Sequence, residues 1–144
     1  MPLGSEKLRT TLLTKAKKEM DKMLEPIKSA WPTSGVSIVS DEWIDPARHP
    51  LINFMVSSLN GLVFLKSVDA LGQYKDAQYM GELFIKVIED VSVDSCVQII
   101  TDNAPVCKAA SMIVEAKYVI FPISFANWNI SFLLYFAALA RNNK

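Results

Sequence analysis

The chain has 144 residues, of which 51% are hydrophobic and 21% are charged. This length and composition exclude a disordered or low-complexity protein and predict one globular domain with a hydrophobic core of ordinary size. Fifteen basic residues balance fifteen acidic ones, but residues 1–30 hold seven basic and four acidic side chains, whereas residues 31–118 hold six and eleven. The acidic middle argues against an independent nucleic-acid-binding surface, which needs clustered lysine and arginine.

The cysteines and the histidine indicate no metal or disulfide framework. Cys96 and Cys107 are the only two cysteines and His49 is the only histidine, so no zinc-binding spacing is present. The polar amino terminus shows no signal peptide. We therefore expect free, buried thiols in a reducing compartment, with the nucleus or the cytoplasm as the location of the protein.

The first predicted element is a helix over residues 14–31, within an N-terminal helical segment at 1–34. Pro26 should kink or split this helix. The lysine-rich run at 15–18 is interpreted as a solvated face, with a nuclear signal or a nucleic-acid contact as the alternative. The apolar side chains recur at three- and four-residue steps, which places them on one helix face: Ala16, Met20, Met23, Leu24, Ile27 and Trp31.

Three strands are predicted next, at residues 36–40, 51–57 and 62–69. The last two are joined by Leu59-Asn60-Gly61, and Asn-Gly between apolar runs is a strong hairpin signal because both residues tolerate positive φ. An amphipathic helix follows at 74–90.

A fourth strand is predicted at 96–101, where the near-continuous apolar sequence suits a strand covered on both faces. A helix should follow and run to about Lys117, with Asn103 as its cap and Pro105 in its first turn. Residues 118–123 are predicted to form a fifth strand. Three strands in succession followed by alternating helices and strands predict an α/β fold with a mixed sheet and flanking helices.

Two aspartates stand where predicted strands end. Asp41 closes the first strand and Asp102 directly follows the fourth. Two strands that each deliver a carboxylate to the same edge of a sheet can hold a divalent metal ion between them. The alternative is that both carboxylates only cap turns at strand ends. No third acid appears in a comparable setting further along the chain.

Several segments together resemble plant hAT-type transposase-like proteins. They are Ser40-Asp41-x-Trp43, residues 50–54, Gly72-x-Tyr74-Lys75-Asp76 and residues 101–110, within a likeness that covers about residues 8–118. The matching part is the front half of the ribonuclease-H-like catalytic core of that family. The resemblance implies a partial ribonuclease-H-like fold at 35–122, with three antiparallel strands and then parallel ones.

In active members of that family, two aspartates and a distant glutamate bind two metal ions for DNA cleavage and strand transfer. The resemblance places Asp41 and Asp102 at the positions of the two aspartates. The late glutamate and the amino-terminal zinc finger of the family have no counterpart in this sequence, so we expect a vestigial site without catalysis. Glu82 is the best candidate to replace the missing acid, with a solvated helix residue as the alternative. No cofactor is expected beyond weakly bound Mg²⁺ or Mn²⁺.

This chain also departs from the family pattern at single positions. Glu42 stands where members usually have glycine, Ile44 where they have threonine, and Val106 where they have asparagine.

The tail at 123–144 has no counterpart that we recognise in the family. Its residues 123–140 form an uncharged run of 18 residues, whereas a transmembrane helix needs roughly 20 predominantly apolar residues. Three interpretations remain: a helix packed on the sheet, a membrane anchor, or a disordered and aggregation-prone tail.

The sequence therefore favours a transposase-derived, non-catalytic domain that acts through protein interaction, including contact with transposase-like proteins, in a nuclear regulatory role. DNA binding by the domain alone is not expected. The alternatives are a metal-dependent DNA-processing enzyme of the hAT transposase type and a small tail-anchored membrane protein.

Overall fold

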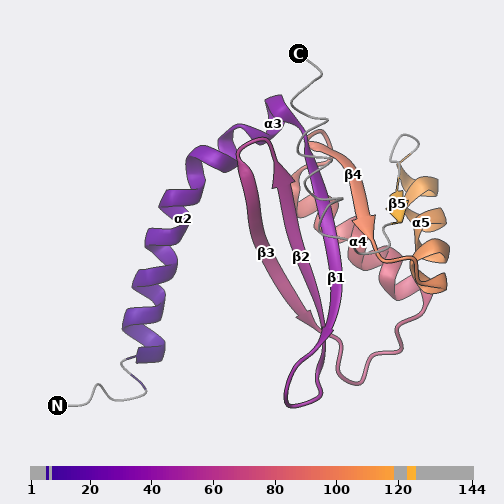
Figure 1. Cartoon of the computed structure of the whole chain (residues 1–144), viewed down its shortest axis with the longest axis horizontal. Helices are drawn as coiled ribbons and strands as arrows, with labels where there is room; N and C mark the ends of the chain where they lie inside the picture. Colours follow the sequence, from indigo (N-terminus) through magenta and orange to yellow (C-terminus); the bar gives the residue numbers. More distant parts are fainter. Residues whose placement is uncertain (1–5, 7, 119–122, 126–144) are drawn as a thin grey trace.

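The computed structural model describes residues 6, 8–118 and 123–125 of the chain. A five-stranded sheet forms its centre, two helices cover one face of the sheet, and a long helix projects from one end (Figure 1). In chain order the elements are a π-helical turn at Leu8–Leu12, α2 (Leu13–Ser29), α3 (Trp31–Ser34), β1 (Val36–Ile44), β2 (Pro50–Ser58), β3 (Gly61–Asp69), α4 (Ala77–Val91), β4 (Cys96–Thr101), α5 (Pro105–Lys117) and β5 (Ile123–Phe125).

The sheet is mixed, with the strand order β3-β2-β1-β4-β5. β1 pairs with β2 and β2 with β3 in antiparallel fashion, whereas β4 runs parallel to both β1 and β5. Three antiparallel strands followed by parallel ones are the predicted α/β arrangement. The described part of the chain has a partial ribonuclease-H-like fold, and the predicted fold class is confirmed.

The hairpin at Asn60-Gly61 is also confirmed. Ser58 pairs with Gly61 across the turn, and Gly61 has a φ of 122°, a conformation in which a residue without Cβ is favoured. β1 is longer than predicted and continues through the polar residues to Ile44. The reason is its antiparallel pairing with β2, which runs from Ser37 opposite Ser57 to Ile44 opposite Pro50 and supplies backbone partners along the whole strand.

The main core lies between the sheet and the two helices α4 and α5. Phe54 of β2 and Phe84 of α4 are both fully buried and meet edge to face, with ring centroids 6.3 Å apart. Each such large side chain stabilises the fold by roughly 1.5–3 kcal/mol. The two helices approach closely at Gly81, where an added Cβ would lie 3.0 Å from the Cβ of Ile113.

Several boundaries differ from those predicted. α4 begins at Ala77 because the carboxylate of Asp76 caps it, accepting a hydrogen bond from the backbone N–H of Tyr79 at 2.8 Å. The prediction of Asn103 as the cap of α5 was wrong. The N-cap is Ala104, whose N–H donates to the carboxylate of Asp102 at 3.3 Å, so the aspartate forms the local turn in place of the asparagine.

The last described strand also lies later than predicted. β5 is Ile123–Phe125, and its first residue pairs with Ile99 of β4. The helix predicted at 123–140 is therefore wrong for its first three residues, because parallel pairing with β4 gives their backbone an extended conformation. Residues 126–140 lie outside the described part of the chain.

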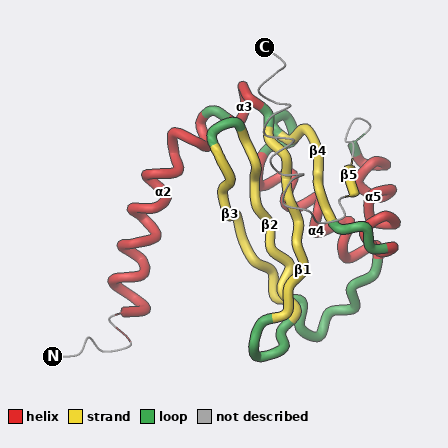
Figure 2. The backbone as a smooth tube through the Cα atoms, in the orientation of Figure 1, coloured by secondary structure: helices red, strands yellow, loops and turns green. Residues whose placement is uncertain are grey.

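α2 stands away from the sheet (Figure 2). The helix is continuous through Pro26 and contains no buried residue, although Leu24 and Ile27 near its end pack against the main core. None of the described helices has the combination of length and apolarity needed to cross a membrane.

Candidate acidic site

Asp41 and Asp102 lie on, or directly after, adjacent parallel strands. Val39 of β1 pairs with Ile100 of β4, and each aspartate follows two residues later along its own strand. The two residues therefore occupy corresponding positions at the same edge of the sheet. This is the relationship that the strand-end pattern in the sequence predicted.

The two carboxylates influence each other electrostatically. The pKa of Asp41 is raised above its ordinary value, first because the side chain is partly buried and second because of the negative charge of Asp102. The neighbouring charge of Glu42 also raises it. A divalent cation between the aspartates would relieve this repulsion, and carboxylate oxygens are ligands that Mg²⁺ and Mn²⁺ prefer.

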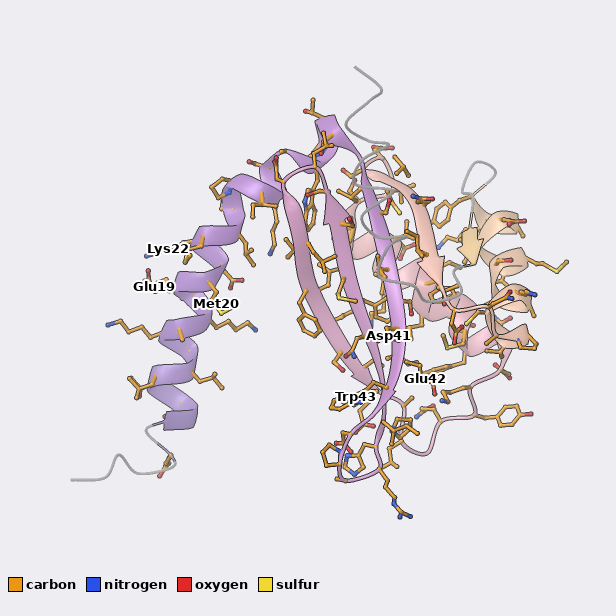
Figure 3. All side chains as sticks on the ribbon, viewed as in Figure 1. Glu19, Met20, Lys22, Asp41, Glu42 and Trp43 are labelled. Carbon is orange, nitrogen blue, oxygen red and sulfur yellow. The ribbon has the colours of Figure 1, made fainter. Side chains whose placement is uncertain are left out.

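The side chains along the end of β1 alternate between the two faces of the sheet. Figure 3 shows Asp41, Glu42 and Trp43 in succession near this end of the strand. Asp41 shares its face with Val39, whereas Ser40 and Glu42 project toward the helices. Glu42 forms an ion pair with Lys75 from the loop that precedes α4. The two residues are 33 positions apart in the sequence, so no local sequence signal predicts this pair.

A small cavity of about 10 Å³ lies beneath this edge, on the helix side of the sheet. It has room for roughly one water molecule and not for a nucleotide. The cavity is lined by Ser40, Glu42, Ile52, Met80, Thr101, Asp102 and Cys107.

Cys107 forms part of the wall of this cavity. The hydroxyl of Thr101 donates to its Sγ at 3.5 Å. Burial is the main cause that raises the pKa of Cys107 to about 11, and the nearby carboxylate of Asp102 adds to the shift. The thiol is therefore protonated at neutral pH, which lowers its reactivity as a nucleophile. Both cysteines are free and buried, as predicted.

Glu82 does not line the cavity. It is exposed on α4, and its Oε1 accepts a hydrogen bond from Nε2 of Gln78 at 2.6 Å. This placement fits the alternative that Glu82 is a solvated helix residue. Among the described residues, no group of three or more His, Cys, Asp and Glu side chains is arranged to hold a metal ion.

His49 is not part of the acidic site around Asp41 and Asp102. It belongs to the β1–β2 connection, where its backbone N–H donates to the carboxylate of Asp45 at 2.8 Å and its ring Nδ1 lies 3.6 Å from the other carboxylate oxygen.

Comparison with known proteins identifies the family of the chain. The model of the family described as domain of unknown function DUF659 matches residues 3–135. The chain belongs to the DUF659 family. This domain is found in hAT-like transposase-derived proteins, so the coarse part of the sequence resemblance is confirmed. The match to the DUF659 model runs past Tyr118, beyond the motifs that carried that resemblance. No curated protein matches the chain.

Proposed function

We propose that this DUF659 domain is a plant hAT-type transposase derivative that acts through protein contacts in the nucleus and does not itself cut DNA. The observation that carries the proposal is the apolar surface of α2. Leu13, Met20 and Met23 are 64%, 61% and 75% exposed, and they recur at helical spacing on one side of the projecting helix. This stripe is the part of the domain best suited to bind another protein.

The stability of α2 also supports a role of this helix in binding another protein. Isolated helices shorter than roughly 12–15 residues are marginal in water, and most helices gain their stability by burying an apolar face. α2 has 17 residues, none of which is fully buried, and only Leu24 and Ile27 near its end pack against the main core. A protein partner that covers Met20 and Met23 would supply the missing burial.

The acidic site supports the non-catalytic part of the proposal. Asp41 and Asp102 provide two carboxylates, whereas Glu42 is neutralised by Lys75 and Glu82 bonds Gln78 on the helix surface. A bound metal ion would activate an attacking oxygen or stabilise a leaving one. The two aspartates offer such an ion few ligands, so we expect weak binding of Mg²⁺ or Mn²⁺.

A second candidate function is metal-dependent DNA processing of the hAT transposase type. The placement of Asp41 and Asp102 on adjacent parallel strands favours it, because in that family these positions carry metal-binding aspartates. The excess of acidic residues in the middle of the chain disfavours independent DNA binding.

Protein contact through α2 is tested by pairing the chain with a full-length hAT-type transposase-like protein in a co-purification assay. The double variant Met20→Lys/Met23→Lys should lose binding because two charges would interrupt the apolar stripe. Met112→Lys is the matched control, since Met112 is 70% exposed on α5, away from the stripe. Equal binding by both variants would contradict the role of α2.

A further inference from the structure

A patch of apolar and acidic side chains lies near the end of β1, across three antiparallel strands. Trp43 of β1 pairs with Leu51 of β2, and Leu51 pairs with Asp69 of β3. Directly paired residues of neighbouring strands project from the same face, so these three side chains form a row across the sheet. The next row on the same face consists of Asp41, Asn53 and Ser67. We call these two rows the Trp43 patch.

The residues between the two rows show which face of the sheet carries the patch. Glu42 pairs with Ile52 and Ile52 with Val68. Ile52 is buried in the main core and Val68 packs against that core, so this intermediate row faces the helices. Because side chains alternate along a strand, the Trp43 patch lies on the opposite face. Trp43 is 53% exposed and Asp69 is also exposed, so the patch is open to solvent (Figure 3).

The two carboxylates of the patch are not neutralised within the described part of the chain. The ion pairs formed there include neither Asp41 nor Asp69. Lys75 pairs with Glu42, and Lys66 of β3 pairs with an acid of α4. The patch therefore combines a negative potential with an exposed indole ring, and this combination is complementary to a cation that has an apolar stem.

We propose that the Trp43 patch binds a segment of a partner protein that carries two basic side chains. The guanidinium or ammonium group of one side chain lies over the indole of Trp43 and beside Asp41, while its aliphatic stem covers Leu51. The second basic group meets Asp69. The proposal rests on the protein-contact function proposed above, but it concerns a surface distinct from α2.

The separation of the two carboxylates defines the ligand further. Asp41 and Asp69 are two strands and two residues apart, which corresponds to about 12 Å across the sheet. Four positions of an extended peptide span about 13 Å, and residues four positions apart project from the same side. Two arginines or lysines with this spacing on an extended segment can therefore reach both carboxylates. A nucleic acid is disfavoured because the carboxylates repel its phosphates.

The test titrates the purified full chain into a fluorescein-labelled, glycine- and serine-rich peptide that carries two arginines four positions apart. Fluorescence anisotropy should show binding, whereas the same peptide with glutamates in place of the arginines should not bind. A peptide with two adjacent arginines should bind several-fold more weakly, because they project from opposite sides. Equal binding of both arginine peptides would overturn the proposal, since it indicates attraction of charge without recognition of spacing.

Substitutions in the patch locate the binding site. Trp43→Ala should weaken binding of the arginine peptide about tenfold, and Trp43→Phe should weaken it less. Asp69→Asn should also weaken binding, and it keeps the oxygen that accepts a hydrogen bond from the backbone N–H of Leu71. Tyr74→Ala is the matched control, since Tyr74 is 85% exposed but belongs to the loop before α4. Unchanged affinity in Trp43→Ala would overturn the proposal.

Further outcomes separate this surface from other binding modes. Met20→Lys/Met23→Lys should bind the arginine peptide as tightly as the unmodified chain, so the role of α2 and the role of the patch can fail independently. Tighter binding of single-stranded DNA than of the arginine peptide would overturn the proposal. Self-association that Trp43→Ala abolishes would also overturn it, because a second copy of the chain would then occupy the patch.

Discussion

Asp41 and Asp102 stand at corresponding positions of two adjacent parallel strands, and the charge of Asp102 raises the pKa of Asp41. The pair is therefore an electrostatic unit as well as a geometric one. Its carboxylates come from β1 and from the end of β4, segments separated by most of the domain in sequence. The sheet brings together two like charges that a cation would stabilise.

The first prediction concerns the titration of Asp41. Substitution Asp102→Asn should lower the pKa of Asp41, because a neighbouring negative charge is removed, but the pKa should stay above its ordinary value because burial is the larger cause. Carbon-detected NMR of the Asp41 carboxyl group measures this directly. An unchanged pKa would show that the two carboxylates do not interact.

The same shift predicts how stability depends on pH. A carboxyl group with a raised pKa in the folded state disfavours folding when it is ionised, so its unfavourable contribution is present at neutral pH. It disappears as the pH falls through the folded-state pKa toward the unfolded value. Asp41→Asn should therefore raise the melting temperature at pH 7 and have less effect near pH 3. A larger gain at pH 3 than at pH 7 would contradict this sign.

The next prediction concerns Mn²⁺. Millimolar Mn²⁺ should stabilise the protein slightly, by about 0.4 kcal/mol when its concentration equals the dissociation constant. Asp41→Asn or Asp102→Asn should abolish the gain, whereas Glu82→Gln should retain it because Glu82 bonds Gln78 on the surface of α4. Thermal unfolding with and without Mn²⁺ makes the comparison. Loss of the gain in Glu82→Gln would instead identify Glu82 as a ligand.

The ion pair between Lys75 and Glu42 should have a larger effect on the affinity for Mn²⁺ than on the stability of the fold. Both partners are partly exposed, so Lys75→Ala should cost at most about 1 kcal/mol of stability. It should also strengthen Mn²⁺ binding, because Glu42 then adds an uncompensated negative charge beside the aspartates. Lys66→Ala is the matched control: it breaks a similarly exposed pair with Asp90, and these two residues come from β3 and α4, not from the strands that carry the aspartates. Equal Mn²⁺ affinity in both variants would disprove the coupling.

The close approach of α4 and α5 gives a prediction about packing. Gly81→Ala should destabilise the protein by about 0–2 kcal/mol, because overpacking against Ile113 costs roughly 1–3 kcal/mol while the helix gains about 1 kcal/mol. In the Ile113→Ala background the same change should become stabilising. A double-mutant cycle of urea unfolding measures the difference, and additive effects would show that the contact is not tight.

Local sequence patterns predicted the parts of this fold that depend on local physics. Asn60-Gly61 identified the hairpin, and Gly61 takes the positive φ that favours glycine. The apolar runs ending in Asp41 and Asp102 located the acidic edge. The cap of α5 was not predictable in the same way. Asp102 and Asn103 are adjacent and both have side chains suited to capping or turn formation, so the local pattern does not distinguish them.

Features that depend on contacts between distant parts of the chain left weaker signals in the sequence, or none. The ion pair of Glu42 with Lys75 depends on how the loop before α4 returns to the sheet, which no short window of sequence reports. The apolar stripe of α2 was visible in the periodicity of Met20 and Met23. Its exposure was not, because periodicity shows that a face is apolar but not whether the chain itself covers it.

The central claim is that the domain retains the acidic pair without DNA cleavage. The most direct test incubates the purified full chain with DNA carrying hAT-type terminal sequences and Mg²⁺ or Mn²⁺, followed by denaturing electrophoresis. We predict no metal-dependent nicking, with or without the substitutions Asp41→Ala and Asp102→Ala. Robust nicking by the unmodified protein that disappears in both variants would contradict the claim and establish the DNA-processing alternative.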